Sequence, residues 1–107
     1  MPVPMTDRLQ KLLAMLERTP GDAFLLYGIA MEHKKENDAA GALAFLDRTL
    51  AVDAGYCYAY YQKGLLLESA GDLDAAKQVY RDGMAAAERK GDAHAKGEIE
   101  AALMLLE

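Results

Sequence analysis

Apolar residues recur every three or four positions along most of the chain, which is the spacing of one face of an α-helix. In residues 7–18 this apolar stripe follows Thr6, a residue type that suits the amino-terminal cap of a helix. The stripe there consists of Leu9, Leu12, Leu13 and Leu16. A second clear stripe, in residues 92–107, consists of Ala95, Ile99, Ala102, Leu103 and Leu106. No segment alternates apolar and polar residues as a strand does, so the pattern predicts an all-α protein.

Glycine, proline, asparagine and aspartate mark the breaks between the predicted helices. Thr19 and Pro20 are expected to start the second helix, with Thr19 as its cap. The breaks divide one domain, 1–107, into an N-terminal helix at 7–18, a helical hairpin at 20–54, a second hairpin at 56–90 and a C-terminal helix at 92–107. Because the connections are short, consecutive helices should pack as antiparallel neighbours.

The two predicted hairpins resemble each other in sequence. Their first helices align with a shift of 36 residues, which matches Gly28 with Gly64. Their second helices align with a shift of 34 residues, which matches Ala42 with Ala76. The difference predicts two extra residues in the first hairpin, near 34–37, as an added half-turn of helix or a longer connection.

A helical hairpin that repeats about every 34 residues resembles the tetratricopeptide repeat (TPR). The second hairpin has the family's aromatic, small and turn residues as Tyr60, Gly64, Gly71, Ala76 and Tyr80. The first hairpin has Phe24, Gly28, Ala42 and Leu46 at the corresponding places. Lys63 departs from the pattern, because a leucine is usual there. The resemblance covers roughly 20–90 and implies a short right-handed superhelix of about six helices, with the two outer helices as caps.

Composition excludes several other classes of protein. The formal net charge of −5 disfavours binding to a nucleic acid backbone. The longest apolar run, 23–31, is far shorter than the roughly 20 residues of a membrane span, so no membrane association is expected. The start of the chain, MPVPMTDRL, lacks an apolar stretch of signal-peptide length, and the single cysteine favours a reducing compartment. A cytoplasmic location is therefore predicted.

Residues that could carry chemistry are few. The chain has one serine (Ser69), one cysteine (Cys57) and two histidines (His33 and His94), and no nucleophile or phosphate-binding motif surrounds them. Three scattered Cys and His residues cannot form a zinc site. We therefore expect no enzymatic activity, no metal and no cofactor.

The resemblance implies instead that the first helix of each hairpin lines a concave groove that holds a partner protein. The groove residues it implies are Leu25, Ile29, Glu32 and His33 from the first hairpin, and Tyr58, Tyr61, Gln62, Leu65, Glu68 and Ser69 from the second. An apolar groove with Glu32 and Glu68 at its rim would favour an apolar segment with a few basic residues. The alternatives are that Leu25, Ile29 and Leu65 are core, and that Tyr58 and Tyr61 are buried scaffold.

Two functions follow from this sequence. The first is an adaptor that binds a peptide or helix of a partner protein in the groove. The second is a homo-oligomerisation module, for example a homodimer, that uses the apolar C-terminal helix. Four successive apolar residues at 103–106 motivate this alternative, because they cannot all face one core.

Overall fold

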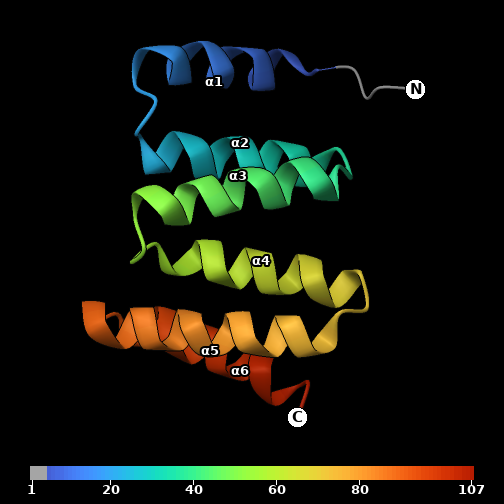
Figure 1. Ribbon diagram of the computed structural model, residues 1–107, viewed down its shortest axis with the longest axis vertical. Coiled ribbons are helices and arrows are strands. Elements are labelled where there is room, and N and C mark those ends of the chain that lie inside the picture. Colours follow the sequence, from blue (N-terminus) through green and yellow to red (C-terminus); the bar gives the residue numbers. More distant parts are fainter. Residues whose placement is uncertain (1–4) are drawn as a thin grey trace. The chain divides into compact units, whose positions relative to one another are not determined.

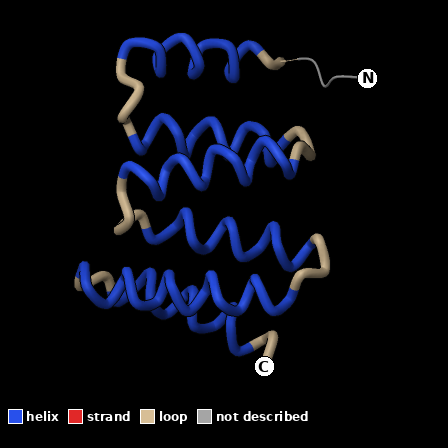
Figure 2. The backbone as a smooth tube through the Cα atoms, in the orientation of Figure 1, coloured by secondary structure: helices blue, strands red, loops and turns tan. Residues whose placement is uncertain are grey.

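Six α-helices form the regular structure of residues 5–107, the part of the chain that the computed structural model describes (Figures 1 and 2). They are α1 (Asp7–Arg18), α2 (Ala23–Lys35), α3 (Ala39–Val52), α4 (Cys57–Ser69), α5 (Leu73–Lys90) and α6 (Ala93–Met104). The all-α prediction is confirmed, although residues 1–4 of the predicted domain lie outside the described residues. The contacts group the chain into two compact units, unit 1 up to Asp53 and unit 2 from Ala54 onward.

Unit 1 contains α1, α2 and α3. α2 and α3 pack side by side as a hairpin, and α1 packs on α2. The buried cluster of this unit consists of Leu9, Leu16, Leu25, Leu26 and Ile29. Leu12 and Leu13 of α1 and Phe45 of α3 pack partly buried against it. The apolar stripe predicted for the first helix is therefore its packed face.

Unit 2 contains α4, α5 and α6. α4 and α5 form the second hairpin, and α6 packs mainly on α5. The buried cluster consists of Cys57, Ala76, Tyr80, Ala87, Ala95, Ile99 and Leu103. The last three of these residues belong to the stripe predicted for the C-terminal helix, and Ala102 and Leu106 pack against the cluster. The face of α6 that was predicted from spacing is thus the face that packs.

The same turn closes both hairpins. Asn37 and Gly71 adopt left-handed backbone conformations, with φ of 60° and 81°. The N–H of the following aspartate donates to the carbonyl five residues earlier, at 2.8 Å for Asp38 and 3.0 Å for Asp72. Each aspartate then caps the next helix by accepting a backbone N–H with its side chain. These matching residues are 34 positions apart.

The predicted excess of two residues in the first hairpin is wrong. α2 and α4 have 13 residues each, and the turns that follow them, 36–38 and 70–72, are equally long. The shift between the hairpins is therefore 34 from the start of their first helices, and Ala30, not Gly28, corresponds to Gly64. The contact between the helices of a hairpin needs a small residue, and alanine meets that need in the first hairpin.

The start of the second helix also differs from the prediction. Thr19 does not cap α2, because its hydroxyl donates to the carbonyl of Met15 at 3.2 Å and it stands at the end of α1. The cap is Asp22, whose Oδ1 accepts the N–H of Leu25 at 3.1 Å. Pro20 consequently lies in the turn before the helix rather than at its first position.

Candidate functional site

Tight packing between α4 and α5 fixes which side of α4 faces outward. A Cβ placed on Gly64 of α4 would overlap the ring of Tyr80, which is fully buried. On α5, a Cβ placed on Gly83 would lie 2.7 Å from the Cβ of Tyr60. Tyr60 and Tyr80 therefore occupy the space that the two glycines leave between the helices.

Another side of α4 carries five of the residues predicted for the groove. Their spacing along the helix is i, i+3, i+4, i+7 and i+10, so they share one face. They are Tyr58, Tyr61, Gln62, Leu65 and Glu68, and each is half-buried. We call these five residues the α4 face. Ser69, at the end of the helix, is exposed.

Several members of the α4 face are held by unit 2 itself. The hydroxyl of Tyr58 donates to Oε1 of Glu98 on α6 at 3.4 Å, and burial and this carboxylate raise the pKa of Tyr58. The hydroxyl of Tyr80 donates to Glu68, and burial, with the carboxylate of Glu68, raises the pKa of Tyr80. Glu68 is thus a hydrogen-bond acceptor within the hairpin.

Tyr61 and Leu65 differ in how far they belong to the core. The ring of Tyr61 lies 6.4 Å from that of Tyr80, centroid to centroid, and Tyr61 packs against the buried cluster, as Tyr58 does. Leu65 is not part of that cluster of described residues. Leu65 is therefore the large apolar side chain of this face with the weakest ties to the core.

In unit 1, three of the predicted groove residues are buried. Leu25 is 6% exposed and Ile29 is 0% exposed, so both are core residues, which is the alternative that the sequence left open. Glu32 is 7% exposed, and its Oε1 lies 2.6 Å from Nε of Arg8 on α1. These residues do not present an open groove, and Glu32 is not a rim charge, because α1 packs on this part of α2.

The fourth predicted residue of unit 1, His33, is half-buried within the α2–α3 hairpin. Its Nδ1 lies 2.9 Å from Oδ2 of Asp38, and its ring stacks on that of Phe45 with centroids 5.4 Å apart. The backbone N–H of Gly41, helped by His33, lowers the pKa of Asp38. His33 therefore links the two helices of the hairpin rather than facing a partner.

The 34-residue register identifies five positions of α2 that correspond to the α4 face and that the 36-residue alignment does not select. Subtracting 34 from each position gives Phe24, Tyr27, Gly28, Met31 and Lys34, all of which are half-buried or exposed. Phe24 is 74% exposed. We call these five residues the α2 face. The turn residues Asn37 and Gly71 carry the signal that could have found it, because they already stand 34 positions apart.

Within residues 5–107, the groups that could carry chemistry lie apart or are already bonded. Cys57 is buried and its Sγ donates to the carbonyl of Gly55 at 3.3 Å. Nε2 of His94 lies 2.5 Å from Oε1 of Glu98. No three Cys, His, Asp or Glu side chains among the described residues cluster as metal ligands would. No helix in this part of the chain has the length and apolar character that crossing a membrane requires.

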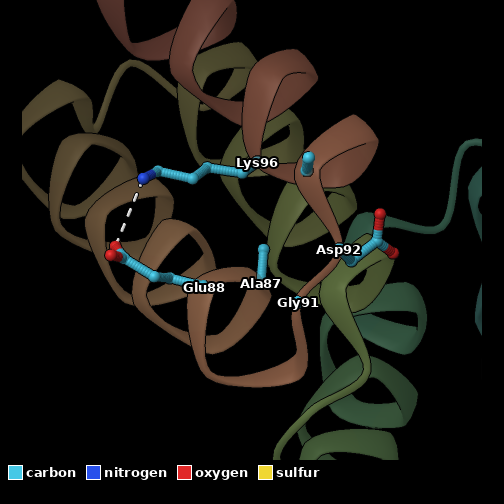
Figure 3. A pocket seen from close by; sticks show the side chains of 6 residues that line it. Ala87, Glu88, Gly91, Asp92 and Lys96 are labelled. Carbon is cyan, nitrogen blue, oxygen red and sulfur yellow. Dashed lines mark hydrogen bonds and ion pairs between the residues drawn. The ribbon is translucent and has the colours of Figure 1, made fainter.

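A hollow of about 230 Å³ lies at the turn between α5 and α6 (Figure 3). It is lined by Ala87, Glu88, Gly91, Asp92, Ala93 and Lys96. Nζ of Lys96 lies 3.2 Å from Oε2 of Glu88, as the dashed line in Figure 3 shows. Oδ1 of Asp92 accepts the N–H of Ala95 at 3.0 Å as the cap of α6. The polar groups of this hollow thus already have structural roles.

Two hairpins in one register, each with a small residue at its helix contact, define a helical-repeat protein. No model of a protein family matches the chain. A TPR repeat-containing protein of Pseudomonas aeruginosa is 30% identical over 103 residues, which cover 96% of this chain and 95% of that protein. A crystal structure of a tetratricopeptide repeat domain protein from Salinibacter ruber matches with a TM-score of 0.75 and 30% identity, over 79% of this chain and 94% of that one. A solution structure of a Bordetella parapertussis protein matches with a TM-score of 0.81 and 27% identity, over 95% of this chain and 89% of that one.

The chain therefore belongs to the tetratricopeptide-repeat family. Members of this family generally mediate protein–protein interaction and are typically scaffolds without enzymatic activity. The resemblance noted in the sequence is confirmed, while the helix boundaries correct the register of the first hairpin.

Proposed function

We propose that this protein is an adaptor that binds an apolar segment or amphipathic helix of a partner protein on the α4 face, with the α2 face as a second contact surface. The observation that carries the proposal is that the same five helix positions are accessible in both hairpins. They are rich in aromatic and aliphatic side chains, which supply most of the binding energy at protein interfaces.

The α4 face would contribute Tyr61 and Leu65 as its main contacts, because Tyr58 and Glu68 are engaged with Glu98 and Tyr80. Basic residues in the partner were expected because Glu32 and Glu68 were placed at the rim of the groove. Glu32 does not favour such residues, since it is buried and paired with Arg8. We therefore propose that these faces recognise the partner mainly through contacts between apolar side chains. A cytoplasmic location stays a prediction.

Replacing Leu65 tests this proposal with little risk to the fold. We expect Leu65→Lys to weaken binding of the natural partner by at least about 1 kcal/mol, since a charge would enter an apolar contact. The partner would be identified first by affinity capture and mass spectrometry, and binding of the purified partner would then be measured by calorimetry.

Leu73→Lys is the matched control, because Leu73 is an exposed leucine at the start of α5. It should leave binding unchanged, and both variants should keep the circular dichroism spectrum and the denaturation midpoint. Equal binding by Leu65→Lys and the natural sequence would show that the α4 face is not the partner site.

A second candidate function is self-association through α6. Met104 is 68% exposed and Leu105 is 88% exposed, so two of the four successive apolar residues at 103–106 contribute little to the core of unit 2. Exposed apolar side chains at neighbouring positions favour contact with another molecule.

A further inference from the structure

The exposed side of α6 is apolar at its centre and acidic at its margins. Gly97, Ala101, Met104 and Leu105 lie opposite the packed stripe of this helix, and all four are exposed. A Cβ placed on Gly97 would have no neighbouring atom within 4 Å. The flanking acidic residues on the two sides are Glu98 and Glu100, and Oε1 of Glu98 lies 2.5 Å from Nε2 of the exposed His94. We call this surface the α6 face.

The exposed side of α1 next to its packed stripe has the opposite charge. Met15, which is 52% exposed, forms its apolar part, together with the accessible edge of Leu12, which also packs against the core of unit 1. Arg8, Lys11 and Arg18 surround these two residues at helical spacing. Glu17 lies on the other side of this helix, whereas Asp7 lies one turn before Lys11 on the same side, so the basic residues of this surface outnumber one acidic residue. We call Arg8, Lys11, Leu12, Met15 and Arg18 the α1 face.

We infer that the α6 face of one molecule docks on the α1 face of a second copy of this chain. This inference deepens the proposed self-association by naming its second surface, and it rests on that proposal. Both faces have an exposed apolar side chain at the centre, Met15 on α1 and Met104 on α6. Their margins carry opposite charges, which favours their encounter and fixes the choice of surface.

Charge also disfavours the two symmetric pairings. If α6 met α6 of another copy, Glu98 and Glu100 would meet acidic margins of the same kind. If α1 met α1, Lys11 and Arg18 would meet basic margins. Like charges across an interface act against a pairing, so the pairing of unlike faces is selected.

The contact joins two different surfaces, so each molecule can offer one face to a neighbour on either side. A contact between two single helices is smaller than the roughly 1,200 Å² at the lower end of stable interfaces. The association is therefore weak and is best observed at high protein concentration and low salt.

Charge reversal on the full-length chain tests this pairing. The mass would be measured by sedimentation equilibrium across about 10 μM to 1 mM, a range suited to a weak contact. The natural sequence should show a mass that rises with concentration. Lys11→Glu and Glu100→Lys should each weaken the association about tenfold, because each places like charges across the interface. The double variant should recover most of the association.

Glu17→Lys is the matched control. It makes the same change of charge as Glu100→Lys, but Glu17 lies on the side of α1 that is not part of the α1 face. It should associate like the natural sequence. Arg8 is not altered because it pairs with Glu32. Circular dichroism would check that each variant keeps its helices.

The possible results separate this pairing from self-association itself. A concentration-independent monomer would overturn both. If the natural chain associates and Glu100→Lys associates more tightly, the α1–α6 pairing is overturned. That result would indicate a contact between two α6 faces. Association that neither Lys11→Glu nor Glu100→Lys alters would also overturn the pairing, while self-association would stand.

Discussion

At the scale of single residues, the contact inside each hairpin matches a small side chain with a larger one. In unit 2 the pair is Gly64 and Tyr80, and a Cβ at Gly64 would overlap the Tyr80 ring. In unit 1 the corresponding positions hold Ala30 and Leu46, both fully buried. One methyl group is gained on the first helix and an aromatic ring is replaced by a shorter side chain on the second. The total volume at the contact is what must be conserved.

We expect Gly64→Ala to lower the free energy of unfolding by about 1–3 kcal/mol, because the new methyl group overpacks a buried ring. Tyr80→Leu should also destabilise, because it removes the ring and the hydroxyl that donates to Glu68. The double variant reproduces the pair found in unit 1. It should cost less than the sum of the single variants by at least about 1 kcal/mol.

Chemical denaturation of the four proteins measures this coupling. Tyr80→Phe serves as a control that keeps the ring and removes only the hydroxyl, so it should not relieve the effect of Gly64→Ala. Strictly additive single variants would contradict direct contact between these two positions.

At the scale of helices and turns, the hairpins depend on a residue that accepts a left-handed backbone conformation. Gly71 has φ of 81°, and Asn37, with φ of 60°, takes the same place in the first hairpin. A residue with a Cβ is strained in this conformation, and asparagine is strained less than most.

We therefore expect Gly71→Ala to lower the free energy of unfolding by about 1 kcal/mol. Gly71→Asn should cost less, since it copies the residue of the first hairpin. Denaturant titration would compare the two variants. Equal costs would indicate that the turn relaxes away from the left-handed conformation.

Much of the arrangement of helices and turns could be predicted from the sequence. Helices α3 and α5 each begin directly after an aspartate, one of the residue types that mark the breaks in the sequence, because this signal is local. The alignment of the first helices failed because glycine was matched with glycine. A Cβ placed on Gly28 would lie 3.9 Å from Cδ1 of Leu12 on α1, so Gly28 is not at the hairpin contact. Ala30 serves that contact, and nothing in its identity distinguishes it from the other alanines.

The same error displaced the candidate site of unit 1. A shift of two residues turns a helix by about 200°, so it moves a residue from one side of the helix to the other. Leu25 and Ile29 were consequently assigned to the partner surface although they lie in the core. In unit 2, where glycine does mark the contact, the five residues of the α4 face are all accessible in part.

At the scale of the whole molecule, partner binding and self-association are assigned to different helices. The α4 face contains Leu65, whereas the proposed contact between copies uses α1 and α6. Lys11 and Leu65 belong to different units. Substitutions of residues without shared contacts usually have additive effects.

We therefore expect Leu65→Lys to weaken partner binding and leave self-association unchanged, whereas Lys11→Glu should do the reverse. The combined variant should show both losses, with a coupling energy within about 0.5 kcal/mol of zero. Calorimetry with the captured partner and sedimentation equilibrium of the free chain would measure the two losses. If Lys11→Glu also weakened partner binding, the partner would require the assembled form, and the α4 face of a single molecule would not suffice. If Leu65→Lys abolished self-association, the α4 face would itself belong to the contact between copies.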